Sequence, residues 1–316
     1  MKARVFIDGA AGTTGLEIHE RLSAREDIAL IRLPENERKD LRARTRALNE
    51  ADAVVLCLPD DAAKEAVSLI ENPDVRVIDA STAHRNAPGW VYGFAELEPD
   101  RRARIAGARR VSNPGCYPTG FLALVRPLVR AGLVPVDFPL TVNAISGYSG
   151  GGKAMIEEFE NKASPSFTEA VVRTYALTLS HKHVPEMQVH AGLAHPPVFA
   201  PSVGRYYRGM IVEVPLQLWA LPGKPTVAAV HETIAAAYAK AELVDVARLM
   251  DGVTRRTLDA EMLKGSNRME IFVLGNDLHG QARLVAVLDN LGKGASGAAV
   301  QNLNLMLGLP ETTGLV

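Results

Sequence analysis

The 316-residue sequence has few cysteines, few aromatic residues and almost no excess of either charge. Its two cysteines, Cys57 and Cys116, are too few for a small domain stabilised by several disulfides. Such a low cysteine content is typical of a protein in a reducing compartment. A net charge of −1 excludes the basic surface expected of a protein that binds nucleic acid or an anionic membrane. No apolar run approaches the ~20 residues of a membrane span, and the N-terminal run is too short for a secretory signal. We therefore expect a cytoplasmic protein without nucleic-acid or membrane partners.

The first hundred residues alternate short apolar runs with helical stretches. Such alternation predicts a parallel sheet with helices on both faces, and the length of the chain favours two domains. Strands are expected at residues 3–8, 28–33, 53–58 and 75–80, and helices from the first glycine turn to about residue 24 and at 62–70.

The pattern changes after Cys116, where strands dominate beyond Gly132. A turn around residues 277–280 joins two apolar runs and predicts an antiparallel hairpin. Pro118 suits the start of a helix that Pro127 should end or kink. The expected strands are 141–146, 208–218, 269–274 and 282–288, and the expected helices are 118–130, 226–239 and 295–309, the last with one apolar face.

A glycine turn, Gly9-Ala10-Ala11-Gly12-Thr13-Thr14-Gly15, follows the first predicted strand. Glycine lets backbone N–H groups approach a pyrophosphate at a helix N-terminus, although any tight strand–helix turn also uses glycine. An acid that would hold the ribose of NAD is missing at the end of the second strand, where Arg32 stands, followed by Arg38 and Lys39. Cations suit a 2′-phosphate, so the pattern favours NADP.

Cys116 lies in Ser112-Asn113-Pro114-Gly115-Cys116-Tyr117-Pro118-Thr119, just before a predicted helix. A helix N-terminus stabilises a thiolate, and its N–H groups, helped by Asn113, could form an oxyanion hole. We therefore predict that Cys116 is a nucleophile. Cys57 lies inside an apolar run and is interpreted as a core residue.

Two further segments carry candidate site residues. His181-Lys182-His183 offers a proton-transfer group, whereas a zinc site there would need further ligands, so no metal is expected. Gly147-Tyr148-Ser149-Gly150-Gly151-Gly152-Lys153 lacks the full phosphate-loop pattern of an NTPase because Ala154 follows the lysine. It is interpreted as an anion-binding loop with Lys153 as its cation.

Taken together, these motifs resemble the N-acetyl-gamma-glutamyl-phosphate reductase family of arginine biosynthesis, in its shorter bacterial (type 2) form. The run around Cys116 is the most specific of these motifs. The aspartate-semialdehyde dehydrogenases share the overall arrangement but have a different cysteine motif. The matching pieces span nearly the whole chain: residues 9–15, 77–85, 112–119, 147–153, 181–187 and 289–297.

The resemblance implies an α/β fold with two domains. Residues 1–117 with 291–316 would form a Rossmann-type NADP-binding domain. Residues 118–290 would form an α+β catalytic and dimerisation domain with a mainly antiparallel sheet, in a homodimer or homotetramer. Further residues expected at the cofactor are Ser81, Asn290, Gly292 and Gly294.

The resemblance also implies a reaction. Cys116 would attack the acyl phosphate, and NADPH would reduce the resulting thioester to N-acetyl-glutamate 5-semialdehyde. His181, or else His183, matches the acid/base position. The anionic substrate needs cations, for which Lys153, Arg85 and Arg208 are candidates. The alternatives are the same chemistry on an aminoadipyl or aspartyl phosphate, a cysteine hydrolase, which would leave the glycine turn without a role, or a non-catalytic NADP-binding sensor.

Overall fold

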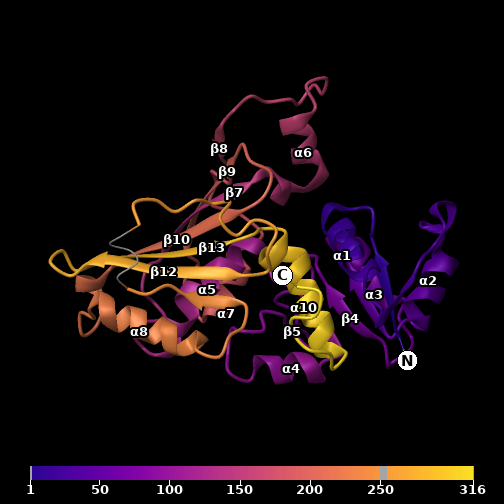
Figure 1. Ribbon diagram of the computed structural model, residues 1–316, viewed down its shortest axis with the longest axis horizontal. Coiled ribbons are helices and arrows are strands. Elements are labelled where there is room, and N and C mark those ends of the chain that lie inside the picture. Colours follow the sequence, from indigo (N-terminus) through magenta and orange to yellow (C-terminus); the bar gives the residue numbers. More distant parts are fainter. Residues whose placement is uncertain (1, 250–254, 316) are drawn as a thin grey trace. The chain divides into compact units, whose positions relative to one another are not determined.

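The computed structural model describes residues 2–249 and 255–315 and divides into two compact units (Figure 1). The first consists of Met1–Ala95, Asp100–Gly115 and Ala295–Val316, and the second of Glu96–Pro99 and Cys116–Gly294. The chain therefore passes between the units just before Cys116 and just after Gly294.

The first unit contains a six-stranded sheet in the order β2-β1-β3-β4-β6-β5, and every strand pair is parallel. Its strands are β1 (Ala3–Asp8), β2 (Ile28–Ile31), β3 (Ala53–Leu56), β4 (Arg76–Asp79), β5 (Val91–Tyr92) and β6 (Arg110–Ser112). Its helices are α1 (Thr13–Ser23), α2 (Leu41–Glu50), α3 (Asp60–Ser68), α4 (Arg101–Gly107) and α10 (Gly297–Met306), with a short 3₁₀ turn at Glu35–Glu37.

Two apolar clusters cover the faces of this parallel sheet. Neighbouring residues of β3 point to opposite faces, so Val55 joins a cluster with Ile18 of α1 and Leu303 of α10. Val54 joins the other cluster, which includes Leu48 of α2 and Ala63 of α3. The predicted parallel sheet with helices on both faces is confirmed.

The second unit contains a seven-stranded sheet in the order β11-β12-β13-β10-β7-β9-β8, and four of its six strand pairs are antiparallel. Its strands are β7 (Thr141–Gly147), β8 (Val172–Thr174), β9 (Val198–Gly204), β10 (Met210–Gln217), β11 (Val244–Val246), β12 (Met269–Asn276) and β13 (Gln281–Leu288). Its helices are α5 (Cys116–Arg130), α6 (Gly152–Glu160), α7 (Val184–Ala191) and α8 (Val227–Tyr238), with 3₁₀ turns at Tyr148–Gly151 and Leu218–Ala220. The π-helical turn Gly292–Ser296 follows β13 and runs across the boundary between the units.

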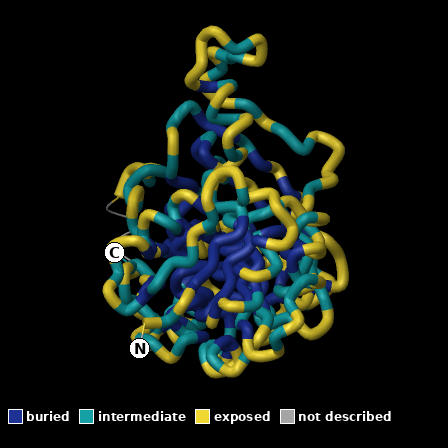
Figure 2. The backbone as a smooth tube through the Cα atoms, turned by 90° about the vertical axis from the view of Figure 1, so that its right-hand side faces the viewer, coloured by how far each residue is buried: buried dark blue, intermediate teal, exposed yellow. Residues whose placement is uncertain are grey.

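Helix α5 packs against β10 and β13, with α7 and α8 beside it (Figure 1). The approach is close at Gly120, where an added Cβ would lie 2.7 Å from Cγ2 of Val212 on β10. Strand β10 alternates buried and more exposed residues, so one of its faces lies against the helices. In Figure 2 the buried segments concentrate in the interior strands and the exposed ones in the outer turns.

Three expectations about the second half of the chain need correction. Helix α5 begins at Cys116 instead of Pro118. Pro127, expected to end or kink this helix, lies inside it, so only the first alternative is excluded. Helices α6 and α7 lie in a region where strands were expected, since their glycine and histidine motifs masked the helical periodicity. Helix α10 is buried on nearly all sides, including Asn302 and Asn304, and has no single apolar face.

Candidate active site

Cys116 is the first residue of α5 and is partly exposed. The N–H groups of a helix's first turn have no partner within the helix, and the helix dipole places partial positive charge there. Both effects favour a thiolate and a developing oxyanion at this position. The local structure therefore fits the predicted role of Cys116, with the thiol inside the helix instead of before it.

The backbone of Gly294 packs closely against Cys116. A Cβ added at Gly294 would lie 2.8 Å from Cβ of Cys116 and 3.2 Å from the main-chain oxygen of Asp289. The N–H of Gly294 donates to that same oxygen of Asp289 at 2.9 Å. Glycine is thus required at 294 by its contact with the candidate nucleophile.

Two tyrosine hydroxyls lie within electrostatic reach of the thiol. The hydroxyl of Tyr175 donates to that of Tyr117 at 3.0 Å. Burial, then the charges of Tyr175 and Cys116, raise the pKa of Tyr117 well above its ordinary value. Burial also raises the pKa of Tyr175 to about 12, with the Cys116 charge adding to the rise and the hydrogen bond to Tyr117 opposing it. Both phenols are therefore neutral hydrogen-bond donors at physiological pH. Sequence reasoning assigned neither of them a role, since nothing marks Tyr175 in the sequence.

The two predicted histidines, His181 and His183, lie beside this pair of tyrosines. The ring of His181 packs edge-on against Tyr117 at 6.4 Å between centroids, against Tyr175 at 5.9 Å and against Phe199 at 5.2 Å. His183 is buried at the N-cap position of α7, and its ring lies 5.9 Å from Tyr117 between centroids. The structure therefore brings both histidines to the residue that follows Cys116.

A backbone hydrogen bond sets the protonation of His181. The N–H of His183 donates to Nδ1 of His181 at 3.1 Å. Because Nδ1 accepts, the neutral ring carries its proton on Nε2. His181 is thus arranged to donate a proton or hydrogen bond at Nε2, whereas accepting one would require it to lose the bond from His183.

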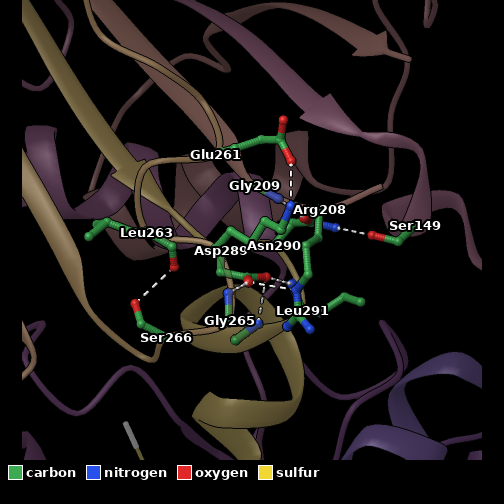
Figure 3. A network of polar contacts seen from close by, with 12 residues as sticks. Ser149, Arg208, Gly209, Glu261, Leu263, Gly265, Ser266, Asp289, Asn290 and Leu291 are labelled. Atoms are coloured by element: carbon green, nitrogen blue, oxygen red, sulfur yellow. Dashed lines mark hydrogen bonds and ion pairs between the residues drawn. The ribbon is translucent and has the colours of Figure 1, made fainter. Parts of the chain in front are cut away.

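Asp289 and Asn290, which follow β13, hold several loops together (Figure 3). Buried Asp289 accepts hydrogen bonds from the N–H groups of Gly265, Leu291 and Gly292 at 2.5–3.0 Å. Nε of Arg208 donates to the same carboxylate at 2.6 Å. The contacts of Arg208 seen here are structural, although its predicted role was to bind substrate.

Asn290 also has structural partners. Its side chain accepts from the N–H of Gly209 at 2.8 Å and donates to Oγ of Ser149 at 3.0 Å (Figure 3). A Cβ at Gly292 would lie 2.1 Å from the main-chain oxygen of Ser266, so the tight turn there needs glycine. The bond to Ser149 connects the turn beside Cys116 to the glycine loop 147–153.

The glycine loop delivers Lys153 to the first turn of α6, where its side chain is exposed. Gly152 has φ +69°, a conformation that favours glycine, and a Cβ at Gly147 would lie 2.6 Å from the main-chain oxygen of Tyr207. A helix N-terminus with an adjacent lysine suits an anion. The arrangement fits the predicted anion-binding loop.

The glycine turn of the first unit leads into α1 and has room for an added group at Gly12. Gly9, at φ +86°, and Gly15 are required by the chain itself, because an added Cβ would lie 2.3 Å from the oxygen of Cys57 and 2.5 Å from that of Gly9, respectively. Gly12 differs: its φ of −75° suits any residue, and the nearest atom would be 3.5 Å away. Helix α1 begins with Thr13 and Thr14. Within residues 2–249 and 255–315, no side chain caps its N-terminus. The open cradle at Gly12 therefore fits a pyrophosphate.

Charge near the glycine turn also fits an anionic cofactor. Asp8, at the end of β1, would repel a phosphate, but Nη2 of Arg44 contacts its carboxylate at 2.9 Å. Burial alone would lower the pKa of Arg44, yet the hydrogen bond and charge of Asp8 raise it above its ordinary value. Arg32 directly follows β2 and is exposed, as are Arg38 and Lys39.

Three other predicted site residues form contacts within the first unit. Ser81 donates to Oδ2 of Asp79 at 2.7 Å. Nε of buried Arg85 donates to the main-chain oxygen of Asn113 at 3.0 Å, and the Asn113 amide donates to that of Ala295 at 2.9 Å. These contacts shape the loop that leads to Cys116, and none of them involves the thiol.

Cys57 lies just after β3, partly buried against the apolar core. Burial, together with the charges of Asp79 and Asp8, raises the pKa of its thiol from 9.0 to about 12. The two cysteines thus differ in environment as the sequence predicted, with Cys57 unreactive at neutral pH.

Comparison with known proteins identifies the relatives of this chain. Residues 116–290 match the family model "Semialdehyde dehydrogenase, dimerisation domain", and residues 4–105 match "Semialdehyde dehydrogenase, NAD binding domain". The chain is 55% identical over 309 residues to N-acetyl-gamma-glutamyl-phosphate reductase of Brucella suis, covering 98% of this chain and 100% of that one. It is 52% identical over 320 residues to N-acetyl-gamma-glutamyl-phosphate reductase 2 of a Nostoc species, covering 99% of each.

The chain belongs to the N-acetyl-gamma-glutamyl-phosphate reductase family. The resemblance stated from the motifs is thereby confirmed, and the protein is an oxidoreductase. Its first unit holds a domain for a nicotinamide dinucleotide, and its second holds the family's dimerisation domain, which supports homo-oligomers.

Solved structures agree on the fold alone. Aspartate semialdehyde dehydrogenase II of Vibrio cholerae, complexed with ASA, has a TM-score of 0.73 at 16% identity, covering 98% of this chain and 99% of that one. The NADP-containing aspartate semialdehyde dehydrogenase of Candida albicans has a TM-score of 0.63 at 13% identity, covering 97% and 98%. Among the described residues, no helix has the length and apolar character that crossing a membrane requires.

Proposed function

We propose that this protein reduces N-acetyl-glutamyl 5-phosphate to N-acetyl-glutamate 5-semialdehyde and phosphate in arginine biosynthesis, with NADPH as its cofactor. The observation that carries the proposal is Cys116 at the start of α5, in a chain 52–55% identical to named reductases of this substrate. The exposed Arg32 after β2 supports NADP over NAD, since a guanidinium suits a 2′-phosphate.

The first step is acyl transfer to the thiol. The Cys116 thiolate attacks the acyl carbon, the bond from that carbon to the phosphate oxygen breaks, and phosphate leaves with its electron pair. N–H groups at the start of α5 and Nε2–H of His181 stabilise the oxyanion of the tetrahedral intermediate. The thioester that remains on Cys116 keeps the acyl group from being lost to water.

The second step is reduction of the thioester. NADPH, when bound, supplies the hydride that adds to the thioester carbon. The tetrahedral oxyanion then re-forms its carbonyl and expels the Cys116 thiolate, which releases the aldehyde. The same donors, His181 and the first turn of α5, stabilise this second oxyanion. His181 acts in both steps as a hydrogen-bond donor through Nε2–H, and His183 orients it through the backbone bond to Nδ1.

Lys153 and the glycine turn take binding roles in the proposal. In the second unit, Lys153 at the start of α6 binds an anionic group of the substrate. In the first unit, the N–H groups at Gly12, Thr13 and Thr14 hold the pyrophosphate. Since both cysteines are free and Cys116 must remain reduced, we also propose a cytoplasmic location, and a dimer or tetramer as the working assembly.

The test of the proposal is phosphate-dependent reduction of NADP by N-acetyl-glutamate 5-semialdehyde, the reverse reaction. The aspartyl and aminoadipyl semialdehydes and NAD are assayed in parallel. We expect the highest kcat/KM for the N-acetylglutamyl substrate with NADP, and loss of turnover in Cys116→Ser with NADP binding retained. Full activity of Cys116→Ser would overturn the thioester mechanism, and a higher kcat/KM for another semialdehyde would overturn the substrate.

The rival function is a non-catalytic NADP-binding sensor. It predicts that Cys116 reacts with iodoacetamide no faster than a free peptide thiol. Fast labelling of Cys116 that abolishes turnover excludes the sensor.

A further inference from the structure

A buried ion pair joins two segments of the second unit that lie far apart in the sequence. Nζ of Lys293 lies 2.7 Å and 2.8 Å from the two carboxylate oxygens of Glu96, and both side chains are 1% exposed. Burying two charges costs free energy that only good geometry offsets, and removing one partner leaves the other charge uncompensated. The pair therefore fixes the position of both segments strongly.

Glu96 belongs to Glu96–Pro99, a short segment of the second unit whose neighbours on both sides lie in the first unit. Two residues further along, Glu98 accepts from Nη2 of Arg126 at 2.5 Å and from Nε at 3.1 Å. Arg126 lies on α5, the helix that begins with Cys116. The segment is thus bonded to the helix of the candidate nucleophile, and we call it the Glu96–Pro99 strap.

The other end of the ion pair lies next to the thiol. Lys293 is in the π-helical turn Gly292–Ser296 and immediately precedes Gly294. Gly294 is the residue whose backbone lies against Cys116, where an added Cβ would be 2.8 Å from Cβ of the cysteine. The strap therefore connects α5, which carries Cys116, to the turn that packs against Cys116.

We propose that the Glu96–Lys293 ion pair is a positioning element, which holds Gly294 against Cys116 and so restricts the thiol to the orientation from which it attacks the acyl carbon. The proposal rests on the proposed nucleophilic role of Cys116. Reacting atoms must be held within a narrow range of geometry, and a displacement of about 1 Å costs on the order of 100-fold in rate. A turn freed from the strap would let Cys116 take other side-chain orientations.

The experiment compares Lys293→Met, Glu96→Gln and the double variant Lys293→Met/Glu96→Met with the wild-type enzyme. The double variant removes both charges, so neither is left buried without its partner. Four quantities are measured: kcat and KM in the phosphate-dependent direction, the rate of Cys116 alkylation by iodoacetamide from pH 6 to 9, and the unfolding temperature. Lys64→Met, which breaks an exposed pair with Asp61, is the matched control.

We expect the double variant to unfold near the wild-type temperature, with kcat lowered about 10- to 100-fold and KM for NADP within twofold. Its alkylation profile should differ from that of the wild type, since the packing around the thiol has changed. Lys64→Met should match the wild type in all four quantities. A double variant with wild-type kcat and alkylation profile would overturn the proposal. If neutralised variants do not fold, Lys293→Arg keeps the charge but displaces it, and wild-type kcat in that variant would also overturn the proposal.

Alkylation needs no substrate, which separates the two proposals. If Cys116→Ser retains turnover, the nucleophile proposal fails, whatever the alkylation profiles show. If Cys116→Ser is inactive but the profiles and kcat of the ion-pair variants equal those of the wild type, only the positioning proposal fails.

Discussion

Gly294 and Cys116 lie in direct contact, and a single methyl group added at position 294 would come within 2.8 Å of Cβ of the cysteine. The two residues are far apart in the sequence of the second unit, since Cys116 is at the start of α5 and Gly294 is in the turn after β13. Their contact links the Asn-Pro-Gly-Cys motif to the Asp-Asn-Leu-Gly-Lys-Gly motif, and it yields the first prediction.

Gly294→Ala should lower kcat about 100-fold, because the new methyl group displaces the thiol. The added volume should also destabilise the fold by about 1–3 kcal/mol. Steady-state kinetics and a urea titration measure the two effects. Gly107→Ala, where an added Cβ meets no atom within 4 Å, is the control. Wild-type kcat in Gly294→Ala would contradict the close packing described here.

The two cysteines should differ in alkylation at neutral pH. The pKa of Cys57 is raised to about 12, mainly by burial, so this thiol stays protonated and unreactive up to about pH 9. Cys116 at the helix N-terminus should be labelled first, with a stoichiometry of one and loss of activity. Peptide mapping after iodoacetamide treatment at pH 7.5 identifies the labelled residue. Equal labelling of both thiols in the folded protein would disprove the assignment.

Two glycines of the same turn should respond differently to alanine. Gly12→Ala should fold normally, because its φ is unrestricted and the nearest atom lies 3.5 Å away, but it should raise KM for NADPH at least 10-fold by blocking the pyrophosphate. Gly15→Ala should destabilise the fold itself, since its Cβ would lie 2.5 Å from the main-chain oxygen of Gly9. Unfolding temperatures and cofactor KM values separate the two effects. A Gly12→Ala variant with wild-type KM would remove Gly12 from the cofactor site.

Arg32→Ala should weaken NADPH binding more than NADH binding. A hydrogen bond to a charged group contributes about 1.5–3 kcal/mol, which corresponds to roughly a 10- to 100-fold rise in KM for NADPH. KM for NADH, which has no 2′-phosphate, should stay within twofold. Arg268→Ala, at an exposed ion pair with Asp245, is the control. Equal effects on both cofactors would assign the 2′-phosphate to another cation.

Stability should fall as the pH rises above about 9. The folded-state pKa of Cys57 is raised from 9.0 to about 12 and that of Tyr175 from 10.0 to about 12, both mainly by burial. Because folding favours the protonated forms, their contribution is complete below the unfolded pKa values and is lost as the pH rises towards 12. Urea midpoints at pH 8, 9.5 and 10.5 should decrease in that order, and Cys57→Ala should flatten the decrease. A midpoint that does not change from pH 8 to 10.5 would contradict these shifts.

Elements and motifs that depend on short stretches of chain are predictable from the amino-acid sequence. The glycine turn after β1, the thiol at a helix start, the hairpin of β12 and β13, and the helix capped by Thr226 all follow from local spacing and from residue types with strong backbone preferences. Such features are predictable because the residues that cause them lie within a few positions of one another.

The residues that share a site could not be predicted in this way, because they come together only in the folded protein. The role of the Glu96–Pro99 strap could not be predicted from its own residues, because that role depends on contacts with Arg126 and Lys293, which are distant in the sequence. Tyr175 joins Tyr117 from a separate strand end, and Arg208, an apparent substrate cation, has the buried carboxylate of Asp289 as its partner. Side chains so distant in sequence interact only after the sheets have formed, since strand order and register fix which of them meet.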